Sequence, residues 1–299
     1  MKLKDLAKSK LESGKTLKFD VGPFSIAVKS DFPNVYEEIA KIYSEFEVLS
    51  DEHFVDFEIT LRNSHSLIRK FFRKQCFFQL GDQEPFTPIP ANQAFPMFEW
   101  GLNWCISSNA HQYLMIHAAV VEKNGVCVVL PAPPGSGKST LTALLVFSGW
   151  RLLSDELTLI ETSSGLIQPL ARPINLKNQS ISVIKQAFPN VAHSNIVKDT
   201  HKGDVCLFKA PDASVANIDQ KSKATHIILP KFSKNEALST DPMSQDSAFF
   251  ELIANSFNYN ILGLSGFNTL TEFIDGTSSF NLRYGNNKAA LEWFEALTL

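Results

Sequence analysis

The spacing of apolar and polar positions along the chain predicts a mixture of β-strands and helices. Residues 17–30 and 55–62 alternate apolar and polar side chains, as strands with one buried face do. Residues 33–46 and 91–106 repeat their apolar side chains every three or four positions, which is the period of an amphipathic helix. We therefore expect an α/β fold.

Two neighbouring apolar runs in the middle of the chain predict an antiparallel hairpin. They occupy residues 113–123 and 126–131, and the Asn124-Gly125 pair between them suits a two-residue turn. Residues 193–204 are polar and predict a surface loop. The remaining patterns predict strands at residues 151–154, 157–161 and 224–232, and helices near residues 181–188, 247–255, 269–274 and 287–297.

These patterns divide the chain into two predicted parts. Residues 1–110 form a small N-terminal α/β portion whose role the sequence does not reveal. Residues 111–299 form the predicted catalytic domain, which holds the motifs of the phosphate site described below.

Residues 131–140 have the features of a phosphate-binding loop. A strand pattern leads into a loop rich in Pro and Gly, and a helical pattern follows Lys138. The glycines let backbone N–H groups turn toward a phosphate, so that Lys138 can reach the β- and γ-phosphates and Ser139 can hold Mg²⁺. We predict an ATP·Mg²⁺ site whose nucleotide contacts come from Pro134, Gly135, Ser136, Gly137, Lys138, Ser139 and Thr140.

The start of this loop departs from the common motif. Ala132 stands where that motif has its first Gly, and Pro133 and Pro134 follow it. We expect a stiffer loop than usual, because proline fixes one backbone dihedral angle. If the stiffness prevents the loop from binding ATP, the prediction of an ATP site fails, and with it any function that uses ATP.

An acidic pair follows the first predicted strand after the loop helix. Asp155 comes directly after residues 151–154, so we expect it at a strand end near Lys138 and Ser139. Phosphoryl transfer needs a carboxylate that orients or deprotonates the accepting hydroxyl, and Asp155 is the candidate base. Glu156 is a candidate Mg²⁺ ligand if a turn directs it to the same side. An exposed acidic turn without function is the alternative.

The composition is that of a globular protein, with 44% hydrophobic and 20% charged residues. The net charge of -3 gives no general attraction to nucleic acid or to an anionic membrane, and no apolar run is long enough to span a bilayer. The four cysteines are widely separated, which argues against a zinc site or a disulfide framework and favours a reducing cytoplasm.

One basic and aromatic stretch raises the alternative of an RNA-stacking face. It covers residues 66–80 and interleaves Arg and Lys with Phe. In a chain of nearly balanced charge, such a stretch is more often a strand with one solvated side, which is the structure that we expect.

The order of these segments resembles the catalytic domain of bacterial HPr kinase/phosphorylase. The chain runs from IHAAVV at residues 116–121, through the hairpin, to PGSGKST at residues 134–140 and GWRLLSDE at residues 149–156. It looks most like the HPr-kinase-related proteins that lack the N-terminal domain of the full enzyme. The resemblance implies a carboxykinase-like mixed sheet with a phosphate-binding loop, and a kinase that phosphorylates serine on a protein or peptide.

The resemblance also implies roles for single residues. His117 falls on the family histidine, which carries a proton or orients the phosphate, and Lys138 falls within the family's catalytic loop. Asp155 falls on the base toward the substrate serine, and Glu156 on the second acid. Arg172 and, more weakly, the Lys202 region match later segments; a surface ion pair would explain Arg172 equally well. A histidine held within the sheet is the alternative for His117.

Three functions stay open at this point. The first is a kinase for a hydroxyl on a protein or peptide, and the second is a kinase of the same fold for a small metabolite. The third is a nucleotide-sensing module that has lost catalysis, which Ala132 and Glu156 would favour. Relatives by this resemblance are associated with small peptide-binding chaperones, and the parent enzyme forms rings, so a chaperone partner and a homo-oligomer are further expectations.

Overall fold

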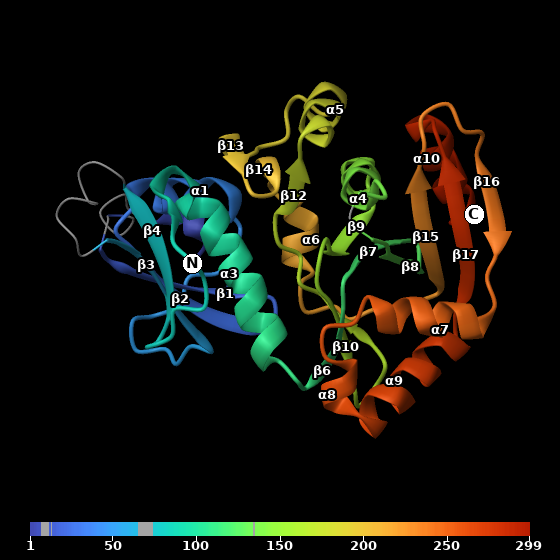
Figure 1. Ribbon diagram of the computed structural model, residues 1–299, viewed down its shortest axis with the longest axis horizontal. Coiled ribbons are helices and arrows are strands. Elements are labelled where there is room, and N and C mark those ends of the chain that lie inside the picture. Colours follow the sequence, from blue (N-terminus) through green and yellow to red (C-terminus); the bar gives the residue numbers. More distant parts are fainter. Residues whose placement is uncertain (7–11, 13, 65–73, 134) are drawn as a thin grey trace. The chain divides into compact units, whose positions relative to one another are not determined.

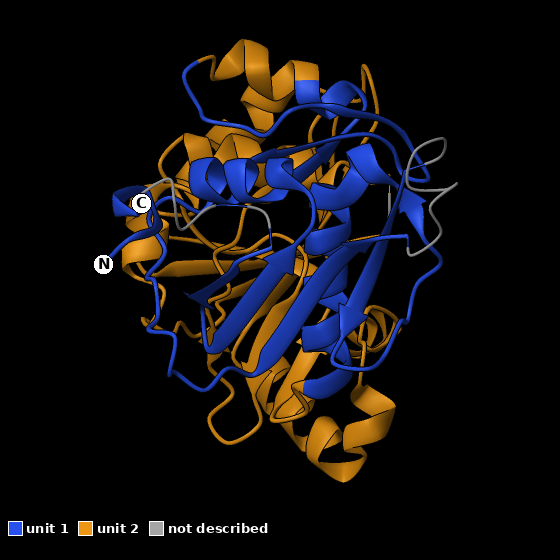
Figure 2. Ribbon diagram, turned by 90° about the vertical axis from the view of Figure 1, so that its left-hand side faces the viewer, with its two compact units in different colours: residues 1–109, 175–181, 190–209 blue, residues 110–174, 182–189, 210–299 orange. Residues whose placement is uncertain are grey.

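Strands and helices alternate along the chain in the computed structural model of the protein, so the predicted α/β class is confirmed (Figure 1). The structure describes residues 1–299 except residues 7–11, 13, 65–73 and 134. Two compact units make up the chain (Figure 2). The first contains residues 1–109, 175–181 and 190–209, and the second contains residues 110–174, 182–189 and 210–299.

The first unit contains a mixed sheet with the strand order β1-β2-β3-β4-β5. Helices α1 and α3 pack against its strands. The strand pattern of residues 17–30 is confirmed and forms a hairpin, because β1 and β2 pair antiparallel around the turn at Gly22. The elements of this sheet and its helices are η1 (Leu3–Asp5), β1 (Thr16–Val21), β2 (Phe24–Ser30), α1 (Pro33–Ile42), β3 (Phe57–Asn63), β4 (Gln75–Leu80), β5 (Ile89–Pro90), η3 (Ala91–Gln93) and α3 (Ala94–Asn109).

Helix α1 follows directly from its sequence. Pro33 occupies its first turn, where the missing N–H has no intrahelical partner to lose. Val35, Ile39 and Ile42 are buried along one face, at the spacing that the sequence predicted. Strand β4 likewise confirms the strand expected in the basic and aromatic stretch, of which residues 66–73 lie outside the described part.

A smaller sheet with the order β12-β14-β13 belongs mainly to the same unit. Its strands are β12 (Ile174–Lys177), β13 (Val197–Thr200) and β14 (Gly203–Phe208). The surface loop predicted for residues 193–204 was therefore wrong in part. Lys198 and Asp199 are both exposed, so this edge strand lacks the apolar alternation by which a half-buried strand is recognised.

Helix α3 approaches the sheet closely at Gly101. A Cβ added at Gly101 would overlap the ring of Phe78, which is fully buried in β4. We expect Gly101→Ala to lower the free energy of unfolding by about 1–3 kcal/mol, because overpacking forces neighbouring groups apart. Chemical denaturation checks this, with Ser108→Ala on the exposed side of α3 as the control. Equal stability of both variants would contradict the tight contact.

The second unit contains a mixed sheet with the order β16-β17-β15-β8-β7-β9 and a small sheet with the order β11-β10-β6. Helix α5 (Gln179–Ala187) begins in the first unit and ends in the second. The other elements are β6 (Tyr113–Ile116), β7 (Ala118–Lys123), β8 (Val126–Pro131), α4 (Lys138–Phe147), β9 (Arg151–Ser154), β10 (Thr158–Glu161), β11 (Ile167–Gln168), α6 (Asp212–Ala216), β15 (His226–Phe232), β16 (Ser239–Pro242), α7 (Gln245–Ala254), α8 (Tyr259–Leu262), α9 (Leu264–Asp275), β17 (Ser278–Tyr284) and α10 (Asn287–Ala296).

The central hairpin of this unit is confirmed. Strands β7 and β8 pair antiparallel from Ala118 opposite Pro131 to Lys123 opposite Val126. Asn124 and Gly125 have φ angles of 50° and 80°, the left-handed pair that a tight hairpin turn requires. Strand β15 runs parallel to β8 on its other side, so β8 lies in the interior of the sheet.

The core of the second unit lies between this sheet and helices α7 and α9. Val129, Leu153 and Ile227 from the strands pack in one buried cluster with Leu252 and Leu270 from the helices. Interior strands with apolar residues on both faces give the continuous apolar runs seen in the sequence. Within the described ranges, no helix is both long enough and apolar enough to cross a membrane.

Candidate functional site

The strand register brings three sequence motifs to the same end of neighbouring strands in the main sheet of the second unit. Strand β8 ends at Pro131, opposite the start of β7 at Ala118, and His117 directly precedes that start. Strand β9 runs in the same direction as β8, and its last residue, Ser154, pairs with Val120. The predicted phosphate-binding loop, His117 and Asp155 therefore lie at the same end of these neighbouring strands.

Two glycines shape the loop after β8. Gly135 and Gly137 have φ angles of 87° and 93°, in the region that side chains with a Cβ rarely adopt. A Cβ added at Gly137 would lie 2.8 Å from the Cβ of Phe232, whereas nothing lies within 4 Å of a Cβ added at Gly135. The loop is thus closely packed at Gly137 and open at Gly135.

Strand ends on the β15 side hold the loop in place. The Phe232 N–H donates a hydrogen bond of 2.8 Å to the Ser136 carbonyl. The Tyr284 hydroxyl lies near Gly137, since an added Cβ there would be 3.4 Å from it. The Phe232 and Tyr284 rings also pack edge to face, with centroids 5.5 Å apart. Burial raises the pKa of Tyr284, so its hydroxyl remains a proton donor.

Sequence reasoning missed both of these supporting residues. Phe232 is the last residue of a predicted strand, and Tyr284 ends β17, where Phe280, Leu282 and Tyr284 alternate as strand residues do. That alternation is a signal that predicts the strand. No local pattern, however, predicts that β15 and β17 pair in parallel with Phe232 opposite Tyr284.

Helix α4 begins inside the loop motif. Gly137 is its N-cap, and Lys138, Ser139 and Thr140 form its first turn. The first N–H groups of a helix have no intrahelical acceptor and face along its axis, which favours a bound phosphate there. The Thr142 hydroxyl donates 2.9 Å to the Lys138 carbonyl and stays within the helix. Pro134, the first residue predicted to contact nucleotide, lies outside the described residues.

The residues of this loop fit a nucleotide phosphate and its Mg²⁺. The open space at Gly135 leaves room beside backbone N–H groups, and the Ser139 hydroxyl on the first turn is the kind of oxygen that Mg²⁺ binds. Within the described part of the chain, no three His, Cys, Asp or Glu side chains gather as a metal site. A P-loop cation needs no such cluster, because it draws most of its oxygen ligands from phosphate and water.

The acidic pair lies in a tight turn between β9 and β10. The Ser154 hydroxyl donates 2.6 Å to the Leu157 carbonyl and closes this turn around Asp155 and Glu156. Asp155 is 8% exposed, whereas Glu156 is half-buried. A buried carboxyl at a strand end differs from an exposed acidic turn, so Asp155 does not match the alternative of a solvated surface residue.

His117 occupies the step between β6 and β7. Its backbone N–H donates a hydrogen bond of 2.7 Å to the Asn255 carbonyl at the end of α7. Its ring centroid lies 6.0 Å from that of the Phe257 ring. Ala118, which follows His117, is held by the Thr158 hydroxyl, which donates a hydrogen bond of 2.9 Å to the Ala118 carbonyl. His117 is half-buried, so it lies at the margin of the sheet and not within its core.

The two later basic candidates lie in different units. Arg172 is buried in the second unit, where its backbone N–H donates a hydrogen bond of 2.8 Å to the Leu170 carbonyl. Lys202 belongs to the first unit and lies over the Trp100 ring, 5.0 Å from its centroid. His201 packs on the same ring, and its burial, with the charges of Lys202 and Lys177, lowers its pKa.

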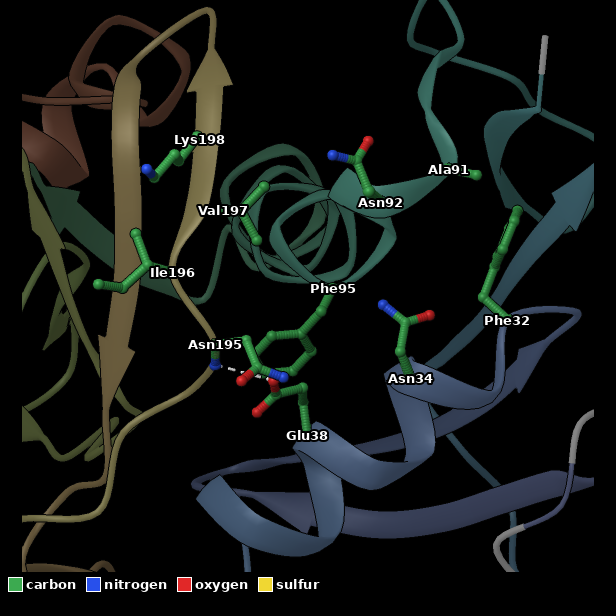
Figure 3. Close-up of a pocket in the computed structure, with 10 residues that line it drawn as sticks. All are labelled: Phe32, Asn34, Glu38, Ala91, Asn92, Phe95, Asn195, Ile196, Val197 and Lys198. Carbon is green, nitrogen blue, oxygen red and sulfur yellow. Dashed lines mark hydrogen bonds between the residues drawn. The ribbon is translucent and has the colours of Figure 1, made fainter.

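The first unit also contains a pocket of about 610 Å³ (Figure 3). Asn34, Glu38 and Phe95 line it together with residues 195–198, and the Asn195 N–H donates 2.8 Å to Glu38 Oε1. The sequence-predicted site residues do not line this pocket. None of the described residues of the loop, the histidine or the acidic pair thus contributes to it.

Comparison with known proteins adds no further constraint. No protein-family model matches the chain, and no curated protein matches it. The functional argument therefore depends on the arrangement of the residues described above.

Proposed function

We propose that the protein is an ATP·Mg²⁺-dependent kinase of the HPr kinase/carboxykinase type that transfers the γ-phosphate to a hydroxyl, with serine on a protein or peptide as the expected acceptor. The observation that carries the proposal is that three motifs lie at the same end of neighbouring strands, namely the phosphate-binding loop, His117 and Asp155. An acid that follows the loop after a single helix, at the same ends of neighbouring strands, is the kind of group that orients or deprotonates the attacking hydroxyl in phosphoryl transfer.

Each residue has a definite task in this proposal. Lys138 and the first-turn amides of α4 bind and orient the triphosphate, while the Ser139 hydroxyl and the Glu156 carboxylate hold Mg²⁺. The bound metal supplies charge neutralisation to the phosphates. Asp155 accepts the proton of the attacking hydroxyl. The oxygen of that hydroxyl forms the new bond to the γ-phosphorus as the bond to ADP breaks and ADP leaves. His117 orients a phosphate oxygen or carries the proton away.

A labelling experiment tests the proposal. Purified protein is incubated with Mg²⁺ and γ-labelled ATP, alone and with cell lysate separated into macromolecules and small molecules. Label in a macromolecule supports the proposed acceptor class. Label only in the small-molecule fraction would indicate a metabolite kinase, and tight nucleotide binding without turnover would indicate a sensing module.

Lys138→Ala tests whether the loop binds ATP at all. A charged hydrogen bond contributes roughly 1.5–3 kcal/mol, so we expect the affinity for ATP to fall by about 10- to 100-fold. Isothermal titration calorimetry measures this, with Lys288→Ala as the control, because Lys288 is 85% exposed on α10. Wild-type affinity in Lys138→Ala would exclude the loop as the nucleotide site.

A further inference from the structure

Helices α7, α8 and α9 of the second unit expose an unusual concentration of large apolar side chains. Between residues 250 and 267, five of them are 45% to 74% exposed, namely Phe250, Phe257, Ile261, Leu264 and Phe267. Single exposed apolar residues are ordinary, but a concentration of them marks a surface that another molecule covers. We call these five residues the apolar surface.

The apolar surface rests on a fixed framework. The half-buried Phe249 ring lies 5.8 Å from the Phe250 ring and 5.7 Å from the Phe267 ring, so it links α7 to α9. Asn258, between α7 and α9, is buried. Its side-chain oxygen accepts a hydrogen bond of 2.9 Å from the Met115 N–H, and its side-chain nitrogen donates one of 2.8 Å to the Tyr113 carbonyl. A surface held in this way loses little conformational freedom when a partner binds.

The charge of the same helices restricts the kind of partner. Residues 245–275 contain Asp246, Glu251, Glu272 and Asp275 but no Lys or Arg. The first, third and fourth of these acids are exposed, and Glu251 is half-buried. Charge complementarity therefore favours a partner with a positive rim around an apolar face, and disfavours an acidic one.

One residue of the apolar surface, Phe257, lies beside His117 of the candidate site. The Phe257 ring lies 6.0 Å from the His117 ring, and the Phe257 N–H donates 2.9 Å to the Met115 carbonyl. A chain bound across Phe257 would thus have its neighbouring residues beside His117. This continuity suits a docking surface for the molecule that the site acts on.

We propose that the apolar surface and its four acids bind a basic amphipathic segment of the acceptor protein or peptide, an inference that rests on the proposed kinase function. Such a segment lays its apolar residues, spaced as on one face of a helix, against an apolar groove or surface. Its Lys and Arg residues face Asp246, Glu272 and their neighbours. The acceptor hydroxyl lies outside the segment, on the chain that continues past Phe257 toward His117.

The test uses a synthetic probe and the whole protein without nucleotide. The probe is a labelled peptide of Leu and Lys with Leu at helical spacing. The control peptide has the same sequence with every Lys replaced by Glu. Fluorescence anisotropy is expected to show saturable binding of the basic peptide alone. Phe250→Ser with Leu264→Ser should weaken it by about tenfold or more, as loss of buried anchors does.

Matched controls separate docking from general stickiness. Phe54 is 85% exposed in the first unit, so Phe54→Ser removes a comparable apolar side chain elsewhere. Asp246→Lys with Glu272→Lys should weaken binding of the basic peptide, whereas Asp82→Lys, exposed in the first unit, should not. Unfolding curves verify that each variant is folded.

Several results would overturn the inference. The first is equal binding of the basic and the acidic peptide. The second is equal binding of the basic peptide by the Phe250→Ser/Leu264→Ser variant and by the Phe54→Ser variant. The third is a dimer in sedimentation that Phe250→Ser/Leu264→Ser dissociates, since a second copy of the chain would then cover the apolar surface. Asp155→Asn should bind the peptide as the wild type does. Phosphate transfer without peptide binding would overturn only the docking surface. Peptide binding without any phosphate transfer would overturn the kinase proposal and the identification of the bound segment as part of an acceptor, and would leave only the peptide-binding surface.

Discussion

Replacing Asp155 by Asn is expected to abolish phosphate transfer while leaving ATP binding nearly intact. The amide keeps the size of the side chain but cannot accept the proton of the attacking hydroxyl. General-base catalysis contributes roughly 100- to 10,000-fold to a rate, and a loss of this size is expected here. Single-turnover transfer of labelled phosphate measures the rate, and calorimetry with ATP measures binding.

The control for this change is another acid of the same unit. Asp241 is exposed on β16, so Asp241→Asn removes an equal charge from the surface and should leave the rate unchanged. Transfer at the wild-type rate in Asp155→Asn would show that Asp155 is not the base. Loss of ATP binding together with transfer would assign Asp155 to the nucleotide site instead.

Replacing Gly137 by Ala is expected to disable the loop itself. Its φ angle of 93° strains any residue with a Cβ, at roughly 1–3 kcal/mol, and the new Cβ would lie 2.8 Å from the Phe232 Cβ. The loop must then move away from Phe232, which carries the hydrogen bond to Ser136. We expect the affinity for ATP to fall about tenfold or more, and stability to fall as well.

Gly149→Ala is the matched control for this change. Gly149 has a φ angle of 103° at the other end of α4, but nothing lies within 4 Å of a Cβ added there. Both variants should be less stable in thermal unfolding because of backbone strain, whereas only Gly137→Ala should bind ATP poorly. Equal ATP affinity in the two variants would mean that the contact with Phe232 does not shape the nucleotide site.

The local elements were largely predictable because each has its own sequence signal. The hairpin turn at Asn124 and Gly125 needs left-handed backbone, which that pair adopts readily. Helix α1 needs one apolar face, and Val35 and Ile39 provide it. Strand β13 was missed because Lys198 and Asp199 are both exposed, so nothing in the local pattern separates that edge strand from a loop.

The candidate site was predictable only as a set of separate motifs. The sequence alone determined a strand, a glycine-containing loop, a helix that starts at Lys138, and an acid that follows the next strand at Asp155. These are local features, since each depends on backbone preferences and on the spacing of neighbouring residues.

Only the tertiary structure decided which other residues surround these motifs. Strand pairing between segments far apart in the sequence brings Phe232 and Tyr284 to the loop, and His117 to the end of α7. It also brings the exposed Phe257 ring, which follows α7 in the chain, to within 6.0 Å of the ring of that histidine. The physical reason is that pairing and packing depend on the burial of a whole sheet, and no short stretch of sequence specifies that burial by itself.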